Sequence, residues 1–201
     1  MNEYLIIKER EILCSFYHSA NGDNWKNNTN WLSDTDIKEW HGVSTNKEGR
    51  VTGISLIDNG IKGNIPDEIY ELNNLESLLL SLNNLFDKIS PKIGNLEKIR
   101  RLDLGDNSLS GVIPEEIYLL TELTFLRLSQ NQLSGEISKK IEHLTKLKYL
   151  GISRNQFTGS IPVAFCNFPN LIRLHIFDNN FTQPYPQEIL DWAKKASHHV
   201  I

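Results

Sequence analysis

Apolar side chains recur along most of the chain with a constant step of 24 residues. Within one repeat they fall at seven positions. In residues 99–122 these are Ile99, Leu102, Leu104, Leu109, Ile113, Ile117 and Leu120. The same seven positions are apolar or aromatic in all six repeats, although hydrophobic residues make up only 39% of the chain. Chance does not produce this pattern, so a single apolar core is expected to run through the whole array.

The spacing inside each repeat predicts its local structure. Leu102 and Leu104 are separated by one residue, as are neighbouring side chains on one face of a strand. Asn107, which recurs with the same step of 24, is expected to end the strand in a bend and to pair with free backbone groups there. An extended stretch then leads to Pro114, which starts a short helical turn. Stacked units of this kind form a parallel sheet on one side and short helices on the other.

The repeat reads LxxLxLxxNxLxGxIPxxIxxLxx, which resembles the plant-type class of leucine-rich repeats. The resemblance implies an α/β fold, a right-handed solenoid with a parallel concave β-sheet, short 3-10 or α turns on the convex side and a helical N-terminal cap. Three repeats depart from the consensus. The departures are Asp87 and Ser90 in the second repeat, Ser138 in the fourth, and Gln183 and Tyr185 in the sixth. We expect local irregularity at these residues around an unchanged core.

The chain is expected to divide into three parts. Residues 1–50 form an N-terminal cap, made of a helix and a tryptophan-rich segment. Residues 51–192 hold the six repeats, the last of them partial and capping, and residues 193–201 form a tail. A solenoid needs such caps because its terminal repeats would otherwise expose their core.

The tryptophan-rich segment resembles the N-terminal cap of the same family. Lys38 and Thr45 stand where plant receptor and inhibitor members carry paired cysteines, so the resemblance is to the disulfide-free caps of bacterial and protist members. Trp25, Trp31 and Trp40 have two interpretations: they cover the first repeat, or they form a platform on which sugars stack. We favour the covering role, because the first repeat needs shielding.

The side chains that alternate with the core leucines point to the open, concave side of the predicted sheet. Equivalent positions of neighbouring strands lie about 4.8 Å apart and form lateral rows. One row reads Gly53, Ser77, Arg101, Phe125, Tyr149 and Arg173. Repeats three to six supply arginines and aromatic rings, which are enriched at interface hot spots, and the first two repeats add an apolar patch. The predicted partner-binding residues are Leu79, Leu82, Arg101, Phe125, Arg127, Tyr149, Arg154, Arg173, His175 and Phe177.

A second interpretation of this surface stays open. Asp103 neighbours Arg127 in its row and could pair with it, and Arg101 could stack on Phe125. The charges would then be satisfied internally, and a partner would bind elsewhere. If the surface does bind a partner, Phe125→Ala combined with Arg127→Ala is expected to weaken binding and to leave thermal stability nearly unchanged.

The sequence holds no motif for catalysis or for cofactor binding. It has no glycine-rich phosphate loop, no HExxH and no CxxC pair. The histidines are scattered, and only His175 falls on the predicted sheet face. His198 and His199, in the tail, are expected to be solvated. We therefore expect no enzymatic activity, no cofactor and no metal site.

Composition narrows the partners and the compartment. A net charge of -4 argues against nucleic-acid binding, and no apolar run reaches the roughly 18 residues that cross a bilayer. Charged residues interrupt the N-terminal segment, which therefore does not read as a signal peptide. Cys14 and Cys166, two lone cysteines, favour a reducing compartment. We expect a cytoplasmic protein, or one exported without a classical signal peptide, such as a host-directed bacterial effector.

Together these observations predict a monomeric, non-enzymatic module that binds another protein on its concave sheet face. The alternative is a carbohydrate or cell-wall binder, or a receptor-type ligand binder, which the resemblance to plant inhibitor and receptor ectodomains implies. The absent cap cysteines and the absent leader count against this alternative.

Overall fold

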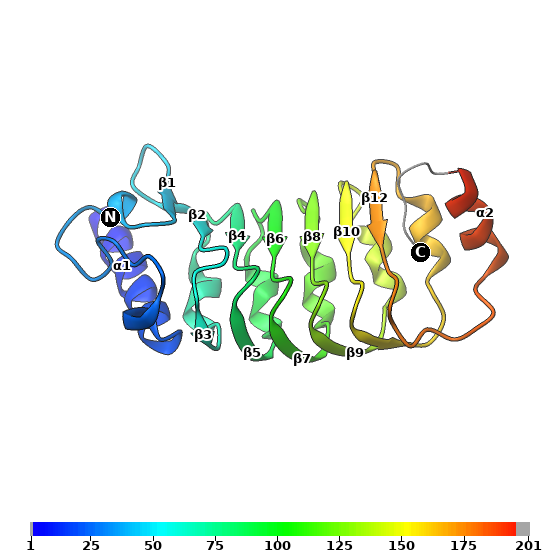
Figure 1. Ribbon diagram of the computed structural model, residues 1–201. Coiled ribbons are helices and arrows are strands. Elements are labelled where there is room, and N and C mark those ends of the chain that lie inside the picture. Colours follow the sequence, from blue (N-terminus) through cyan, green and yellow to red (C-terminus); the bar gives the residue numbers. More distant parts are fainter. Residues whose placement is uncertain (1, 196–201) are drawn as a thin grey trace.

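The computed structural model describes residues 2–195, which form one elongated stack of coils (Figure 1). One side of the stack is a seven-stranded sheet, whose exposed side we call the concave face. In spatial order its strands are β1 (Val43–Thr45), β2 (Val51–Ser55), β4 (Ser77–Leu79), β6 (Arg101–Asp103), β8 (Phe125–Arg127), β10 (Tyr149–Gly151) and β12 (Arg173–His175). β1 runs antiparallel to β2, and the other neighbours are parallel. The predicted parallel sheet is confirmed, and the cap adds an antiparallel edge strand.

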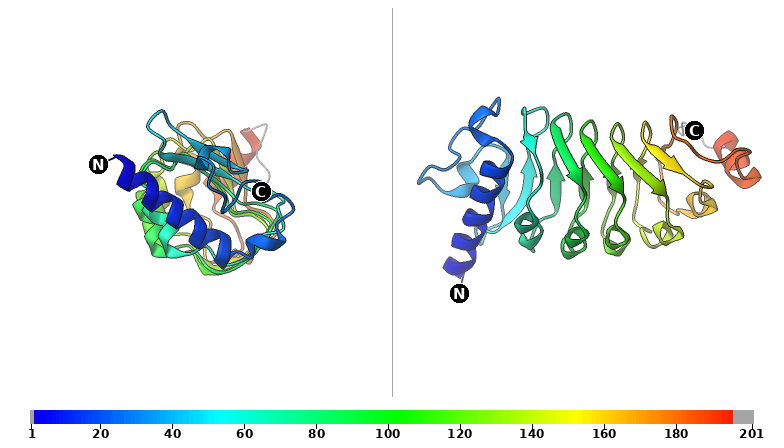
Figure 2. Two further views of the ribbon diagram at one scale, coloured as in Figure 1. Left: turned by 90° about the vertical axis from the view of Figure 1, so that its left-hand side faces the viewer. Right: turned by 90° about the horizontal axis from the view of Figure 1, so that it is seen from below.

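The rest of each coil returns through a second sheet and a short 3-10 helix (Figure 2). The second sheet contains β3 (Lys62–Gly63), β5 (Asn84–Lys88), β7 (Ser108–Val112), β9 (Gln132–Glu136) and β11 (Gln156–Thr158). The helices are η3 (Asp67–Glu71), η4 (Pro91–Asn95), η5 (Glu115–Leu119), η6 (Lys139–His143) and η7 (Val163–Asn167). The solenoid with short helical turns opposite the concave sheet is therefore confirmed. The repeat pattern had predicted extended backbone for the second sheet, but not its pairing.

The apolar positions of the repeat form the core inside the coils. Among the described side chains at these positions, all are buried except Ile65, Phe168, Leu171 and Tyr185. These four are half-buried and pack against the core. The side chain of Trp192, the last predicted core residue, lies outside the described part of the chain. The core thus weakens only toward the ends of the array.

The repeated asparagine joins each coil to the coil before it. The Nδ2 of Asn107 donates to the carbonyl oxygen of Leu80 in the preceding coil at 3.0 Å and to that of Leu104 in its own coil at 3.2 Å. Its Oδ1 accepts from the backbone N–H of Leu85 at 2.9 Å. Equivalent bonds are made by Asn83, Asn131, Asn155 and Asn179. The predicted pairing at the bend is confirmed, and the same amide also links consecutive coils.

The serines that replace the consensus proline leave the backbone unchanged. Ser138 has φ -64° and ψ 143°, against -65° and 142° for Pro114 one repeat earlier. The hydroxyl of Ser138 accepts from the backbone N–H of Lys140 at 3.3 Å and so caps η6, and Ser90 caps η4 in the same way. The expected irregularity at these serines is therefore wrong. In the sixth repeat it is present, since the residues described there add no strand to the second sheet.

Asp87 stands at a position where four other repeats have glycine, and its backbone is strained. Its φ is 81°, close to the 77° of Gly111 and the 82° of Gly135. An L side chain in this region costs about 1–2 kcal/mol, and the larger unfolded-state entropy of glycine offsets about 0.5–1 kcal/mol. Asp87→Gly is therefore expected to raise the free energy of unfolding by about 0.5 kcal/mol in urea denaturation. The control Asn84→Gly, in the same strand, is expected to lower it, and a loss of stability in Asp87→Gly would refute the strain argument.

The N-terminal cap closes the first coil with a helix and three tryptophans. Helix α1 (Asn2–Ser19) lies across the end of the stack (Figure 2), and η1 (Gly22–Asn24) and η2 (Ile37–Glu39) follow it. Trp25, Trp31 and Trp40 are buried in a chain of ring contacts, with centroids 4.9 Å and 5.1 Å apart. The covering role is therefore confirmed, and these rings are not a surface for sugars.

A buried ion pair ties α1 to the first strand of the repeats. Glu9 is 2% exposed, and its Oε1 accepts from Nη2 of Arg50 at 2.6 Å and from Nε at 2.8 Å. Its Oε2 accepts from the backbone N–H of Val51 at 2.7 Å. Both carboxylate oxygens are thus satisfied, and the cap is held by polar bonds as well as by its rings.

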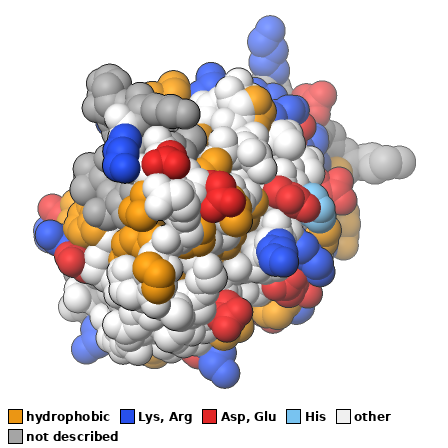
Figure 3. All heavy atoms as spheres, turned by 90° about the vertical axis from the view of Figure 1, so that its right-hand side faces the viewer, with side chains coloured by type: hydrophobic (Ala, Val, Ile, Leu, Met, Phe, Trp, Pro, Cys, Tyr) orange, Lys and Arg blue, Asp and Glu red, His pale blue; other side chains and the backbone are white. Residues whose placement is uncertain are grey.

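A helix of nine residues covers the other end of the stack. Helix α2 (Gln187–Lys195) packs on η7, and apolar side chains are still visible at this end of the molecule (Figure 3). The predicted tail, with His198 and His199, lies largely outside the described residues.

Candidate functional site

The concave face gathers the predicted residues of repeats three to six in the expected rows. The strand register pairs Arg101 with Phe125, Phe125 with Tyr149, and Tyr149 with Arg173. The rings of Phe125 and Tyr149 stack, with centroids 4.5 Å apart and an interplanar angle of 11°. The guanidinium of Arg101 lies 5.7 Å from the centroid of Phe125. Because β6 and β10 flank β8 on opposite sides, Arg101 and Tyr149 cover the two faces of the Phe125 ring.

Tyr149 leans toward the second row of the face. A Cβ built on Gly151 would lie 3.0 Å from the Tyr149 hydroxyl, so glycine makes room for this ring. The hydroxyl lies 3.2 Å from Nδ1 of His175. Burial lowers the pKa of His175, with further lowering from Arg173 and Arg127, and burial raises the pKa of Tyr149. A lowered pKa favours the neutral imidazole at pH 7, and its Nδ1 shares a hydrogen bond with the Tyr149 hydroxyl.

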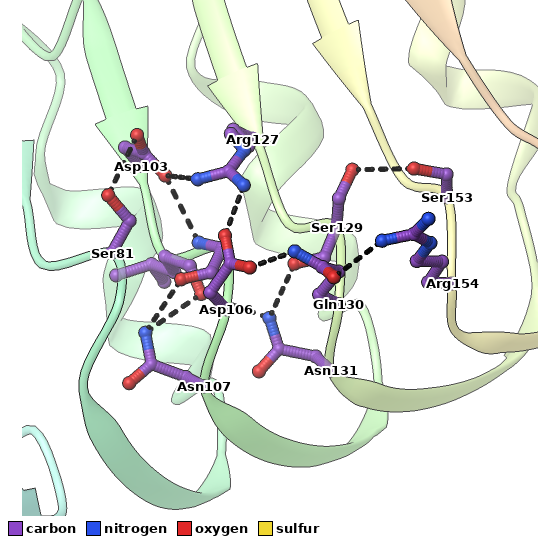
Figure 4. Close-up of polar contacts among 12 residues, drawn as sticks. Ser81, Asp103, Asp106, Asn107, Arg127, Ser129, Gln130, Asn131, Ser153 and Arg154 are labelled. Carbon is purple, nitrogen blue, oxygen red and sulfur yellow. Dashed lines mark hydrogen bonds and ion pairs between the residues drawn. The ribbon is translucent and has the colours of Figure 1, made fainter.

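Arg127 is held by two aspartates (Figure 4). Its guanidinium lies 3.5 Å from Asp103 and pairs more closely with Asp106. A Cβ on Gly105 would lie 2.8 Å from the guanidinium carbon, so this glycine lets the arginine lie along the sheet. Arg127→Ala would leave two partly buried carboxylates without their cation. The double substitution that includes it is thus expected to cost stability, contrary to the sequence prediction, and it does not isolate binding.

The aspartates belong to a hydrogen-bonded network that crosses several strands (Figure 4). Asp103 accepts from the Ser81 hydroxyl at 3.1 Å, and Asp106 accepts from the side-chain amide of Gln130. Arg154 then donates to the Gln130 carbonyl oxygen at 2.8 Å. Sequence reasoning singled out arginines and rings but not Ser81, Asp106 or Gln130. For Asp106 and Gln130 the sequence signal was that hydrogen-bonding side chains follow one another at a step of one repeat, through Asp106, Gln130 and Arg154.

Arg154 and Phe177 extend this network toward the last coil. The guanidinium of Arg154 lies 3.5 Å from Asp178 and 5.6 Å from the Phe177 ring centroid. A shallow hollow of about 280 Å³ opens between these residues and the Tyr149–His175 pair. Its lining consists of Arg127, Ser129, Gln130, Tyr149, Ser153, Arg154, His175 and Phe177.

The apolar patch of the first two repeats is smaller than predicted. Leu82 and Ile57 are 51% and 44% exposed, whereas Leu79 is only 9% exposed. Leu79 is the last residue of β4 and is flanked in its row by Ser55 of β2 and Asp103 of β6, so its neighbours shield it. The prediction that Leu79 is available to a partner is therefore wrong.

The described residues offer binding groups and little reactive chemistry. Within residues 2–195, no group of three or more histidine, cysteine, aspartate or glutamate side chains is placed to hold a metal ion. Cys14 and Cys166 are free, and burial raises the pKa of both thiols, which disfavours the reactive thiolate. No helix in the described part of the chain is long and apolar enough to cross a membrane.

Comparison with known proteins places these features among leucine-rich repeats. The leucine-rich-repeat family matches residues 73–133 and 146–168. Receptor-like protein kinase 7 of Arabidopsis thaliana is 36% identical over 83 residues, which are 41% of this chain and 8% of the kinase. The ectodomain of the Arabidopsis receptor kinase HAESA, solved with an IDA peptide hormone, has a TM-score of 0.82 and 26% identity over 92% of this chain and 31% of its own. The SOBIR1 ectodomain of Arabidopsis thaliana has a TM-score of 0.71 and 26% identity, over 88% of this chain and 95% of its own.

These comparisons correct the expected location. The two solved structures named above are ectodomains of receptor kinases, the parts that lie outside the cell. The expectation of a cytoplasmic protein, or of a bacterial effector exported without a leader, is therefore wrong.

Proposed function

Because the chain is a leucine-rich-repeat protein of the plant-type class, we propose that it is a receptor-type, non-enzymatic module that binds a protein or peptide ligand. The ligand lies on the concave face between β6 and β12. The observation that carries this proposal is the row formed by Arg101, Phe125, Tyr149 and Arg173 on four adjacent strands. Rings and arginines fixed side by side are the usual composition of an interface hot spot.

The geometry of the rings favours a polypeptide over a sugar. Carbohydrate recognition by aromatic residues needs an open ring face, and both faces of Phe125 are covered by its neighbours. The three tryptophans of the cap are buried. A peptide side chain can instead pack against the exposed edges of the stacked pair. The receptor-type interpretation is thus better supported than the carbohydrate one.

The ring pair is also ordered before any ligand arrives. Tyr149 is fixed on one side by Phe125 and on the other by its bond to His175. Binding therefore immobilises few additional rotamers, which lowers the entropic cost of association.

Selection from a random 12-residue peptide library on the immobilised protein tests the proposal. Phe125→Ala combined with Tyr149→Ala is expected to weaken the enriched peptides at least about tenfold in fluorescence anisotropy, as for hot-spot residues. The matched control is Phe86→Ala, which removes a ring that is 49% exposed on the second sheet, and it should keep full affinity. Failure to enrich any peptide, or equal affinity for the double variant, would count against a concave binding site.

A further inference from the structure

The charge that is left without an ion-pair partner on the concave face is positive, although the chain has a net charge of -4. Each aspartate of the face has a cationic partner: Asp103 and Asp106 pair with Arg127, Asp178 pairs with Arg154, and Asp58 pairs with Lys26. Arg101 and Arg173 are exposed, and neither forms an ion pair with a carboxylate of the described residues. Two unneutralised cations thus stand at the two ends of the ring row.

We infer that this row binds an extended acidic peptide segment with an apolar side chain between two carboxylates. This inference rests on the proposed function and names its ligand class. The carboxylates pair with Arg101 and Arg173, and the apolar side chain packs on Phe125 and Tyr149. Charge complementarity selects the acidic partner, because the aspartates of the face pair with other cations and not with these two arginines.

The spacing of the row sets the spacing of the ligand. Arg101 and Arg173 are three strand steps apart, through β8 and β10, which is about 14 Å at about 4.8 Å per step. An extended chain rises about 3.4 Å per residue and turns alternate side chains to the same side, so residues i and i+4 are also about 14 Å apart. Residue i+2 then lies over the ring pair. The expected motif is acidic–x–apolar–x–acidic.

The orientation of the rings suits this ligand. Phe125 and Tyr149 stack along the row, so their edges face the partner. The edge of an aromatic ring carries partial positive charge, whereas its face is negative. The edges therefore add to the attraction of the two guanidinium groups for carboxylates and still provide apolar contact area for the central side chain.

Parallel selections from the same library, on wild type and on Arg101→Glu with Arg173→Glu, test the inference. Wild type is expected to enrich peptides with acidic residues at i and i+4, and the charge-reversed variant to enrich basic residues at the same spacing. Peptides selected on wild type should lose about tenfold or more in affinity for the reversed variant, and high salt should weaken them.

The matched control is Lys62→Glu with Lys139→Glu, which changes the net charge equally at exposed positions on β3 and η6. It should keep the wild-type affinity. Thermal melts establish that each variant is folded. If the reversed variant does not fold, Arg101→Gln with Arg173→Gln, which removes the charges without reversing them, provides the same comparison.

The outcomes separate this inference from the proposed function. Peptides that need Phe125 and Tyr149 but lack the acidic pair, or that bind the reversed variant equally well, overturn the acidic ligand and leave a concave peptide site. An absence of ring-dependent peptides overturns both. Polygalacturonate, an acidic sugar polymer, serves as a competitor: tighter binding than every enriched peptide, with the same dependence on Arg101 and Arg173, would assign the row to a polysaccharide.

Discussion

Asn155→Ala is expected to lower the free energy of unfolding by about 3 kcal/mol, because it removes several buried hydrogen bonds at once. The side-chain amide of Asn155 donates to the carbonyl oxygens of Leu128 at 3.0 Å and Ile152 at 3.2 Å. Its carbonyl oxygen accepts from the backbone N–H of Leu133 at 3.0 Å. Asn155 is only 8% exposed, so alanine would leave these buried backbone groups without partners. Groups on two coils lose their bonds, so the loss weakens the contact between the coils.

Equilibrium urea denaturation followed by far-ultraviolet circular dichroism measures this loss. Gln156→Ala is the matched control, since Gln156 is the next residue and its side chain is exposed on β11. The control should change stability by less than about 0.5 kcal/mol, as exposed substitutions do. A loss of less than about 1 kcal/mol in Asn155→Ala would mean that water replaces the amide and that the repeated asparagines contribute little to stability.

Glu9→Ala is expected to cost about 3–5 kcal/mol, the usual penalty for leaving one partner of a buried ion pair uncompensated. Arg50, whose side chain is 11% exposed, would lose the carboxylate that accepts two of its N–H groups. The backbone N–H of Val51 would lose its acceptor as well. Since Val51 is the first residue of β2, the substitution should release the cap from the first coil.

Thermal melts and hydrogen exchange on α1 measure this release. Glu11→Ala, an exposed substitution on the same helix, is the control and should melt like wild type. Glu9→Leu combined with Arg50→Leu should cost less than Glu9→Ala alone, because the pair is removed together and no buried charge is left unpaired. Equal exchange rates in wild type and Glu9→Ala would show that the rings alone hold the cap.

The fold could be predicted from the sequence because the 24-residue repeat of apolar positions determines how the coils stack. Every coil must present its apolar positions to its neighbours, so Leu102, Leu126 and Leu150 fall in register across the sheet. The same register, which follows from the 24-residue step, predicts Phe125 beside Tyr149, as the structure shows. The antiparallel strand β1 was not predicted, because it lies in the cap, where no repeat constrains the chain.

Side-chain direction limited the prediction of the site. Arg127 is named as a partner-binding residue because its row faces solvent, while the open alternative pairs it with Asp103. The structure has that pair and adds a second one with Asp106. This sideways direction of Arg127 requires the space left by Gly105, just as Tyr149 uses the space over Gly151. The row of a residue fixes the position of its Cα and Cβ atoms but not the direction of the rest of its side chain. Small residues in neighbouring rows are the signal that would have indicated these lateral contacts.

The asparagines that recur every 24 residues bond only to their own coil and to the coil before it, and this has a consequence for how such arrays gain repeats. Each amide reaches back to the coil before it and to no coil further away, as Asn107 does to Leu80 and Leu85. A duplicated copy of residues 99–122 therefore brings the asparagine that bonds it to the coil before it. Its own backbone then supplies the groups to which the asparagine of the following coil bonds. Gene duplication in units of 24 residues can thus widen the sheet by about 4.8 Å per event without redesigning any junction.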